Sequence, residues 1–438
     1  MASDTAPALG AASVGDRERR RAVRLTIVAS LIGTSIEWYD FNLYVALAAL
    51  VFNKLYFPSN SPTASLLLAY GTLVVGFITR PIGGVVFGHF GDRIGRKPLL
   101  ALTLTIMAVA TFLIGAVPTY ASIGVAAPIV LVALRLVQGF AMGGEWGGAV
   151  LIAYEFAPPG RRGLYACLPQ IGFAVGFALS SGIVTLLSST LSNEQFLAWG
   201  WRCAFFVSIP LLFIGLYVRL KLLETPHFVR ARESFHLTKM PAGELLKNYR
   251  GSVVIGLLLR AGEGGYFTVF TLVIIAYLTG IIHLPRTWVL WSLTVASLLL
   301  IVTMPIASAW SDRVGHRRFF SRAVLVSGVA SFPLLWMMQT GIPALAMIGV
   351  VLAIGVFWAP VYGPEAVVMC GLFPTPVRYT GVSLVYQFGS ILFLAPVPFL
   401  ATALLAWDTN QPWYLACYVL FACIVTAVAL GTMRRSYD

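Results

Sequence analysis

Two carboxylic acids lie close together in an apolar stretch near the start of the chain. Glu37 and Asp40 follow about a dozen largely apolar residues, and their spacing places both carboxyls on one helical face, with the Tyr44 phenol further along it. A neighbouring acid and low access to water let one of such a pair hold a proton and release it when its surroundings open. We therefore predict a proton site here, and the sequence does not decide which carboxyl titrates. The alternative is a pair of acids that lie in water at a helix end.

Buried cations are the second kind of candidate, because an arginine inside an apolar segment is expensive and points to a function. Arg80 has no acid nearby on its own helix, and its planar guanidinium can form paired hydrogen bonds to a carboxylate. A partnership with Glu37 or Asp40 is the alternative. Arg135 shares a helical face with Gln138 and Glu145, so a binding stripe and an internal ion pair both remain open, and Glu145 is a further candidate for proton coupling.

Other polar candidates lie further along the chain. Arg260 and Glu263 are three residues apart, which fits a self-neutralised pair as well as a binding site. Arg202 either contacts a substrate or anchors the membrane interface. Helical spacing also groups Trp358 with Tyr362, where core packing is the alternative to cavity lining. The predicted substrate-binding residues are Tyr44, Arg80, Arg135, Gln138, Arg202, Arg260, Glu263, Trp358, Tyr362 and Gln387.

The elements that position these residues are long apolar segments. The chain has 438 residues, of which 58% are hydrophobic and 11% charged, and about 20 apolar residues are needed to cross a bilayer. The sequence therefore predicts an all-α membrane protein with twelve transmembrane helices. They lie near residues 25–52, 65–90, 98–118, 125–149, 163–189, 199–220, 251–278, 287–310, 319–340, 342–363, 379–406 and 412–433.

The positive charges follow the membrane topology. The formal net charge is +13, and most Lys and Arg residues lie in the tails and in alternate loops, which is the positive-inside pattern. Only Lys54 and Arg286 fall in the opposite loops. We predict that both termini are cytoplasmic and that the partner is the lipid bilayer rather than nucleic acid.

Several other kinds of function are not indicated. The five cysteines and five histidines lack the spacing of a metal site or a disulfide framework, so we predict neither a metal nor a cofactor. The first 24 residues are polar and show no signal peptide. No catalytic nucleophile or phosphate loop is evident, and we do not expect an enzyme.

One charged sequence motif occurs twice. "GHFGDRIGRKPLL" begins at Gly88 and "WSDRVGHRRFF" at Trp310, so that Asp312 follows Asp92 by 220 residues, half the chain. This period predicts two similar six-helix halves in the same orientation, at residues 25–220 and 251–433. Residues 221–250 form the predicted cytoplasmic joint, and residues 1–24 and 434–438 the cytoplasmic tails.

With the repeat in view, the chain resembles the major facilitator superfamily, whose signature is the charged loop between its second and third helices. It is most similar to the metabolite:proton symporter subfamily and, within it, to the shikimate transporter group. The motifs that carry this resemblance are "EWYDF" at Glu37, "RPIGG" at Arg80, "RLVQGFAMGGEWGGA" at Arg135, "WGWR" at Trp199 and "LFPTPVRYTG" at Leu372. The chain departs from the family at Gly371, where an acid is common, and at His316, where Arg is usual.

The resemblance implies that the charged loops are two leaves of a cytoplasmic gate, and that ion pairs form between their residues when it is shut. The predicted gating residues are Asp92, Arg93, Arg96, Asp312, Arg313 and Arg317. It further implies a monomeric importer of a small carboxylate with protons, working by alternating access in the bacterial inner membrane. Proton-coupled osmolyte symport, proton-driven export and a nontransporting sensor are the alternatives.

Overall fold

The computed structural model describes residues 31–94, 96–143, 146–155, 157–220, 247–407 and 411–433, together with Val28 and Leu245. In this part of the chain every regular element is a helix, and ten helices are long and apolar enough to cross a membrane. The shorter apolar helix Ala101–Ala116 and the helix of residues 31–47 provide two more segments. The predicted fold class is confirmed. The predicted tails and most of the predicted joint lie outside the described residues.

The first half contains six helical rods in chain order. The rods are residues 31–47 continued by η1 (Ala48–Phe52) and α2 (Asn53–Leu55); α3 (Pro62–Ile94); α4 (Arg96–Ala116); α6 (Ala126–Met142) with α7 (Trp146–Glu155), preceded by the short α5 (Tyr120–Ile123); α8 (Arg162–Thr190); and α9 (Asn193–Gln195), η2 (Phe196–Gly200), α10 (Trp201–Phe206) and α11 (Ser208–Leu220).

The second half repeats this order. Its rods are α14 (Arg250–Thr268) continued by η3 (Val269–Val273), α15 (Ile274–Ala276) and η4 (Tyr277–Ile281); α16 (Arg286–Val314); α17 (His316–Gln339); α18 (Pro343–Leu352), η5 (Ala353–Trp358) and α19 (Ala359–Gly371); α20 (Thr375–Phe393) with α21 (Val397–Trp407); and α22 (Trp413–Thr432).

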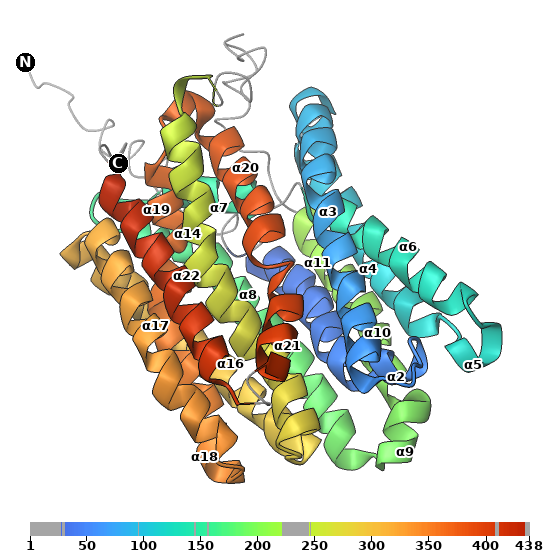
Figure 1. The fold of residues 1–438 in the computed structure, drawn as a ribbon. Helices are drawn as coiled ribbons and strands as arrows, with labels where there is room; N and C mark the ends of the chain where they lie inside the picture. The colour runs from blue at the N-terminus through green and yellow to red at the C-terminus, as the bar shows by residue number, and fades with distance from the viewer. Residues whose placement is uncertain are drawn as a thin grey trace, which may run out of the picture.

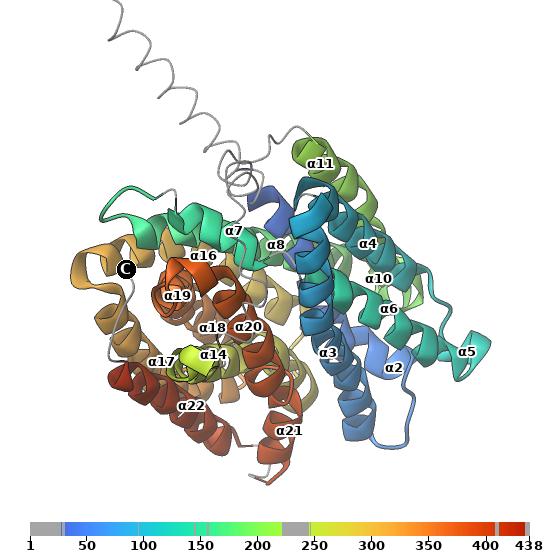
Figure 2. The same ribbon diagram turned by 90° about the horizontal axis from the view of Figure 1, so that it is seen from above.

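The two halves lie beside each other, with the blue and green helices on one side of Figure 1 and the yellow to red helices on the other. They meet where α8 packs against α16, and on another side of the interface where α3 packs against α20 and α21, as the view in Figure 2 shows. We call the end that holds the start of α8 and the turn between α16 and α17 the basic end. It is at the top of Figure 1, and the end that holds α5 and α9 is the far end.

Close backbone contact between α3 and α6 positions two of the predicted arginines. A Cβ atom on Gly83 would lie 1.8 Å from the carbonyl oxygen of Phe140, and one on Gly139 would lie 2.0 Å from the carbonyl oxygen of Gly76. Small residues at such positions let membrane helices approach until their backbones touch. Arg80 on α3 and Arg135 on α6 are therefore fixed on adjoining helices.

This packing can be tested with one added methyl group. Gly83→Ala forces α3 away from Phe140, and overpacking of this kind costs about 1–3 kcal/mol. We expect a lower unfolding temperature for the detergent-solubilised protein, measured by intrinsic fluorescence. Gly71→Ala is the matched control on the same helix, because a Cβ there has no neighbour within 4 Å. Equal stability of the two variants would contradict close α3–α6 packing.

Candidate functional site

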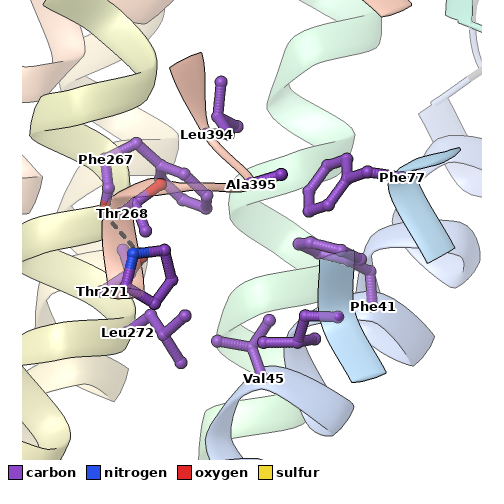
Figure 3. A pocket seen from close by; sticks show the side chains of 11 residues that line it. Phe41, Val45, Phe77, Phe267, Thr268, Thr271, Leu272, Leu394 and Ala395 are labelled. Carbon is purple, nitrogen blue, oxygen red and sulfur yellow. Dashed lines mark hydrogen bonds between the residues drawn. The ribbon is translucent and has the colours of Figure 1, made fainter. Parts of the chain in front are cut away.

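Side chains between the halves change in character along the molecule. Toward the far end lies a cavity of about 520 Å³, which we call the far cavity. Next comes a small apolar pocket of about 20 Å³. Figure 3 shows it with Phe41 and Phe77 on one side and Phe267 and Leu272 on the other. About one helical turn closer to the basic end, the same helices carry the buried charges.

Arg135 is buried within the first half and is held by neutral groups. Its Nη1 donates to Gln138 Oε1 at 2.8 Å, and Gln138 Nε2 donates to Thr111 Oγ1 at 2.7 Å. The guanidinium carbon lies 3.9 Å from the centre of the Tyr44 ring, and the Tyr44 hydroxyl is 2.6 Å from Thr72 Oγ1. The sequence pattern thus brings Tyr44, Arg135 and Gln138 together. Glu145, the predicted ion-pair partner, lies outside the described residues.

Arg80 is 4% exposed and forms no ion pair in the described part of the chain. Its Nη2 donates to Met142 Sδ at 3.4 Å, and its guanidinium carbon lies 4.2 Å from the centre of the Phe77 ring and 5.0 Å from that of Phe41. It also interacts electrostatically with Tyr386 of the other half. It interacts electrostatically with Glu37 of the first half as well, which is the alternative partnership that the sequence offered, but no direct ion pair between these two described residues is formed.

The predicted acid pair lies inside the protein. Glu37 is 6% exposed, and Asp40 is completely buried. Neither carboxyl oxygen of Asp40 makes a hydrogen bond within the described residues. The alternative of two acids in water at a helix end is therefore wrong for this structure.

The second half contains a cluster of three charged groups. Arg260 Nη1 contacts both Glu263 and Glu365, with 2.9 Å to Glu365 Oε1, and Nη2 donates to Ser390 Oγ at 3.3 Å. The guanidinium carbon lies 4.3 Å from the centre of the Tyr386 ring. The expected Arg260–Glu263 pair is present. Glu365, the second carboxyl that contacts Arg260, was not predicted as a site residue. The only sequence signal for Glu365 is its helical spacing from Trp358 and Tyr362.

Aromatic rings join the halves next to this cluster. Trp358 stacks on Tyr362 with a centroid distance of 4.5 Å, and Phe173 of α8 meets the two rings edge-on at 5.0 and 5.4 Å. The Tyr362 hydroxyl has no hydrogen-bond partner among the described residues. These rings pack at the interface between the halves, and neither the far cavity nor the small apolar pocket is lined by them.

A second contact between the halves lies closer to the basic end. Trp146 of α7 stacks on Tyr386 at 3.6 Å, and Gln387 Nε2 donates to the carbonyl oxygen of Gly143 at 3.1 Å. The predicted residue Gln387 therefore bridges α20 and the end of α6. Any separation of the halves on this side must break both contacts.

At the basic end Asp312 binds across the interface. Its carboxylate accepts hydrogen bonds from the backbone N–H groups of Gly163 at 2.7 Å and Leu164 at 3.1 Å, in the first turn of α8. A carboxylate at a helix N-terminus is favourable, because the helix dipole is positive there. Arg317 instead donates to the carbonyl oxygens of Gly431 and Met433. Arg317 therefore does not form the expected ion pair with Asp312 in this structure.

The other four predicted gating residues and the predicted binding residue Arg202 remain to be placed. Arg313 lies in the last turn of α16, where it is exposed. The side chains of Asp92, Arg93 and Arg96 lie outside the described part of the chain. Arg202 lies toward the far end, where Nη1 donates to the carbonyl oxygens of Gly115 and Val117 at 2.6 and 2.7 Å. It caps the end of α4, which fits the anchor alternative.

A helical membrane protein whose two halves enclose buried charges between them is built as a membrane transporter. The family model of the Major Facilitator Superfamily matches residues 30–396. The chain belongs to this superfamily and is a transporter, not an enzyme.

Named relatives cover nearly the whole chain. The inner membrane metabolite transport protein YhjE of Escherichia coli is 39% identical over 88% of both chains. The shikimate transporter of the same species is 36% identical over 94% of this chain and 95% of its own. The proline/betaine transporter of Salmonella typhimurium is 31% identical over 94% of this chain and 83% of its own.

Among solved structures, the xylose transporter XylE from E. coli in a partially occluded inward open conformation superimposes with a TM-score of 0.74. The match covers 95% of this chain and 98% of the XylE chain, and the two sequences are 15% identical. At this identity the likeness shows the fold alone. The recognition of the family from the charged repeat and the ordered motifs is confirmed.

The charge cluster of the second half yields a stability prediction. Arg260→Gln leaves two buried carboxyls without their shared cation, and breaking a buried pair in this way costs about 3–5 kcal/mol. Glu365→Gln keeps the contact between Arg260 and Glu263 and should cost less. Thermal unfolding in detergent measures both. In the Arg260→Gln background, adding Glu365→Gln should restore part of the loss, whereas independent, additive losses would show that the three groups do not act as one cluster.

Proposed function

We propose that the chain imports a small organic acid anion together with protons by alternating access. The observation that carries this proposal is Arg80, a buried cation at the interface of the halves that makes no hydrogen bond or ion pair to a carboxylate among the described residues, with Glu37 near enough to interact with it electrostatically. A cation in such a place is costly, and a bound carboxylate would neutralise it through paired hydrogen bonds. Arg135, which is also held by neutral partners, adds positive charge nearby.

The comparisons support this choice of substrate and driving force. The name of the shikimate transporter refers to a cyclic hydroxylated carboxylate. Its match with this chain covers 94% of this chain. One structure of the same fold is described as a D-xylose-proton symporter. We extend both features to this chain as part of the proposal.

The proton site follows from burial. Asp40 is completely enclosed and forms no ion pair with a cation in the described part of the chain, so its ionised form would be a buried charge without a counter-ion. A proton removes that charge, and Glu37 one turn away is its neighbour for transfer. Glu145 remains a candidate outside the described residues. The pair Glu263 and Glu365 offers a second place for a proton, because two carboxyls share one guanidinium.

The orientation follows from the charges. We place the basic end in the cytoplasm of a bacterial cell, with both termini there and the far cavity open to the outside. Asp312 and the first turn of α8 then form part of the cytoplasmic gate, in a protein that works as a monomer. Modest contacts suit a gate, since it must open again.

Osmolyte symport is the second candidate. The stacked rings of Trp358 and Tyr362, with Phe173 edge-on, could receive a quaternary ammonium group, because aromatic faces attract such cations. The proline/betaine relative supports the same possibility. Export with the same machinery differs from import only in direction.

Uptake into liposomes by the purified protein tests these functions. A monoanion carried with one proton moves no net charge, so its accumulation should follow the pH gradient, about tenfold or ~1.4 kcal/mol per unit. A zwitterion carried with one proton moves a full charge, and a potential adds ~2.3 kcal/mol per 100 mV. We expect shikimate uptake driven by the pH gradient. Saturable betaine uptake without response to any carboxylate would contradict the proposal.

The Arg80 assignment has its own variants. Arg80→Gln should abolish carboxylate binding, and Arg80→Lys should retain only part of it, because an ammonium does not form the paired contact. Competition binding of labelled shikimate to folded protein measures both. The assignment would be wrong if Arg80→Gln bound shikimate like wild type.

Proton coupling is tested at Asp40. Asp40→Asn cannot bind or release a proton, so it should lose accumulation driven by a pH gradient while still exchanging substrate already present on both sides. Exchange serves as the internal control for folding. Wild-type accumulation by both Asp40→Asn and Glu37→Gln would remove the pair from the mechanism.

A further inference from the structure

The far cavity is large enough for a ligand of its own. Its volume of about 520 Å³ lies within the range of roughly 300–1,000 Å³ that small-molecule sites occupy. It is formed by both halves, with α2 and the start of α3 from the first and η4, α21 and the start of α16 from the second. The apolar pocket of Phe41, Phe77 and Phe267 separates it from Arg80.

The charged residues that are described at this cavity are both basic. Lys54 and Arg286 line it, and none of the described residues that line it is acidic. These are the two basic residues that depart from the charge pattern of the loops. Because bacterial membrane proteins place few cations on this side, two of them at one cavity call for a separate explanation.

Arg286 is held in place by neutral groups. Its Nε donates to Ser188 Oγ at 2.7 Å, and its Nη1 donates to Asn193 Oδ1 at 3.2 Å. Its guanidinium carbon lies 4.0 Å from the centre of the Phe196 ring. No carboxylate contacts it within the described residues, so its positive charge is fixed in position but not neutralised.

A second observation points to a ligand with hydroxyl groups. Tyr70 lines the cavity and is 1% exposed, and its hydroxyl has no hydrogen-bond partner in the described part of the chain. Asn53, a half-buried residue on the neighbouring helix, also lines the cavity, and its buried Oδ1 has no hydrogen-bond partner among the described residues. Buried polar atoms are normally hydrogen-bonded, and a ligand that carries hydroxyls would satisfy both.

We propose that the far cavity is a capture site for a small hydroxylated carboxylate. Arg286 and Lys54 attract and hold the carboxylate, and Tyr70 and Asn53 bind the ring hydroxyls. The anion waits there until the apolar pocket opens toward Arg80. This inference rests on the proposed function, since the captured ligand is the transported anion. Positive charge at a cavity mouth raises the local concentration of an anion and its association rate, most strongly at low salt.

Initial uptake rates of labelled shikimate, measured at low and high salt in oriented liposomes, test the capture site. The double variant Lys54→Gln with Arg286→Gln should raise KM about tenfold at low salt and leave kcat unchanged. Its KM should also lose most of the salt dependence of wild type. Arg286→Lys should stay near wild type, because it keeps the charge. Lys247→Gln is the matched control, an exposed lysine at the basic end.

The hydroxyl contact is tested separately. Tyr70→Phe should raise KM for shikimate severalfold but not for cyclohexenecarboxylate, which has the same ring without hydroxyls. Equal effects on the two acids would contradict this part of the site.

Two failures are distinguishable. If wild type transports shikimate while the double variant keeps its KM and salt dependence, the capture site is wrong and the proposed function stands. If Arg286→Lys raises KM as much as the double variant does, the residue is only a tie between the halves, and the capture site is also overturned. If wild type shows no saturable carboxylate uptake, the proposed function fails, and the capture site fails with it.

Discussion

A guanidinium removed from water needs a negative charge, and this structure meets that need in two different ways. In the second half, Arg260 contacts two carboxyls and a serine, so its charge is satisfied by the protein itself. In the first half, Arg80 and Arg135 have aromatic faces, a thioether and an amide around them. The halves therefore share a fold but differ in how their buried arginines are held, by two carboxyls in the second half and mainly by aromatic and neutral groups in the first.

The helices around Arg80 leave its position little freedom. α3 and α6 touch through glycines, so neither helix can turn independently of the other. On the facing side, the Trp146–Tyr386 stack links the end of the first bundle to the ring that covers Arg260. Both arginines are thus connected through close packing to the contact between the halves.

The fold was predictable because its causes are local and repeated. Apolar segments of bilayer length predict the helices, and the repeated charged motif at Asp92 and Asp312 predicts the two halves. Parts of the site were predictable too, since residues on one helical face stay together, as Tyr44 with Asp40 and Arg260 with Glu263. The contact of Arg260 with Glu365 depends on helices 105 residues apart, which no local spacing encodes. The Asp312 contact was missed for a similar reason, because its partners are backbone N–H groups that carry no sequence signal.

The antiparallel helices α8 and α16 are tied to each other at both ends. Asp312, near the end of α16, binds the first turn of α8, while Arg286, at the start of α16, binds Ser188 in the last turn of α8. The hydroxyls of Thr185 and Thr294 meet between them at 3.1 Å. Sliding by one helical turn, about 5.4 Å, would break every one of these contacts at once. A tilt about one tie breaks only the other. The two ties thus allow one end of this helix pair to separate while the contact at the other end is kept.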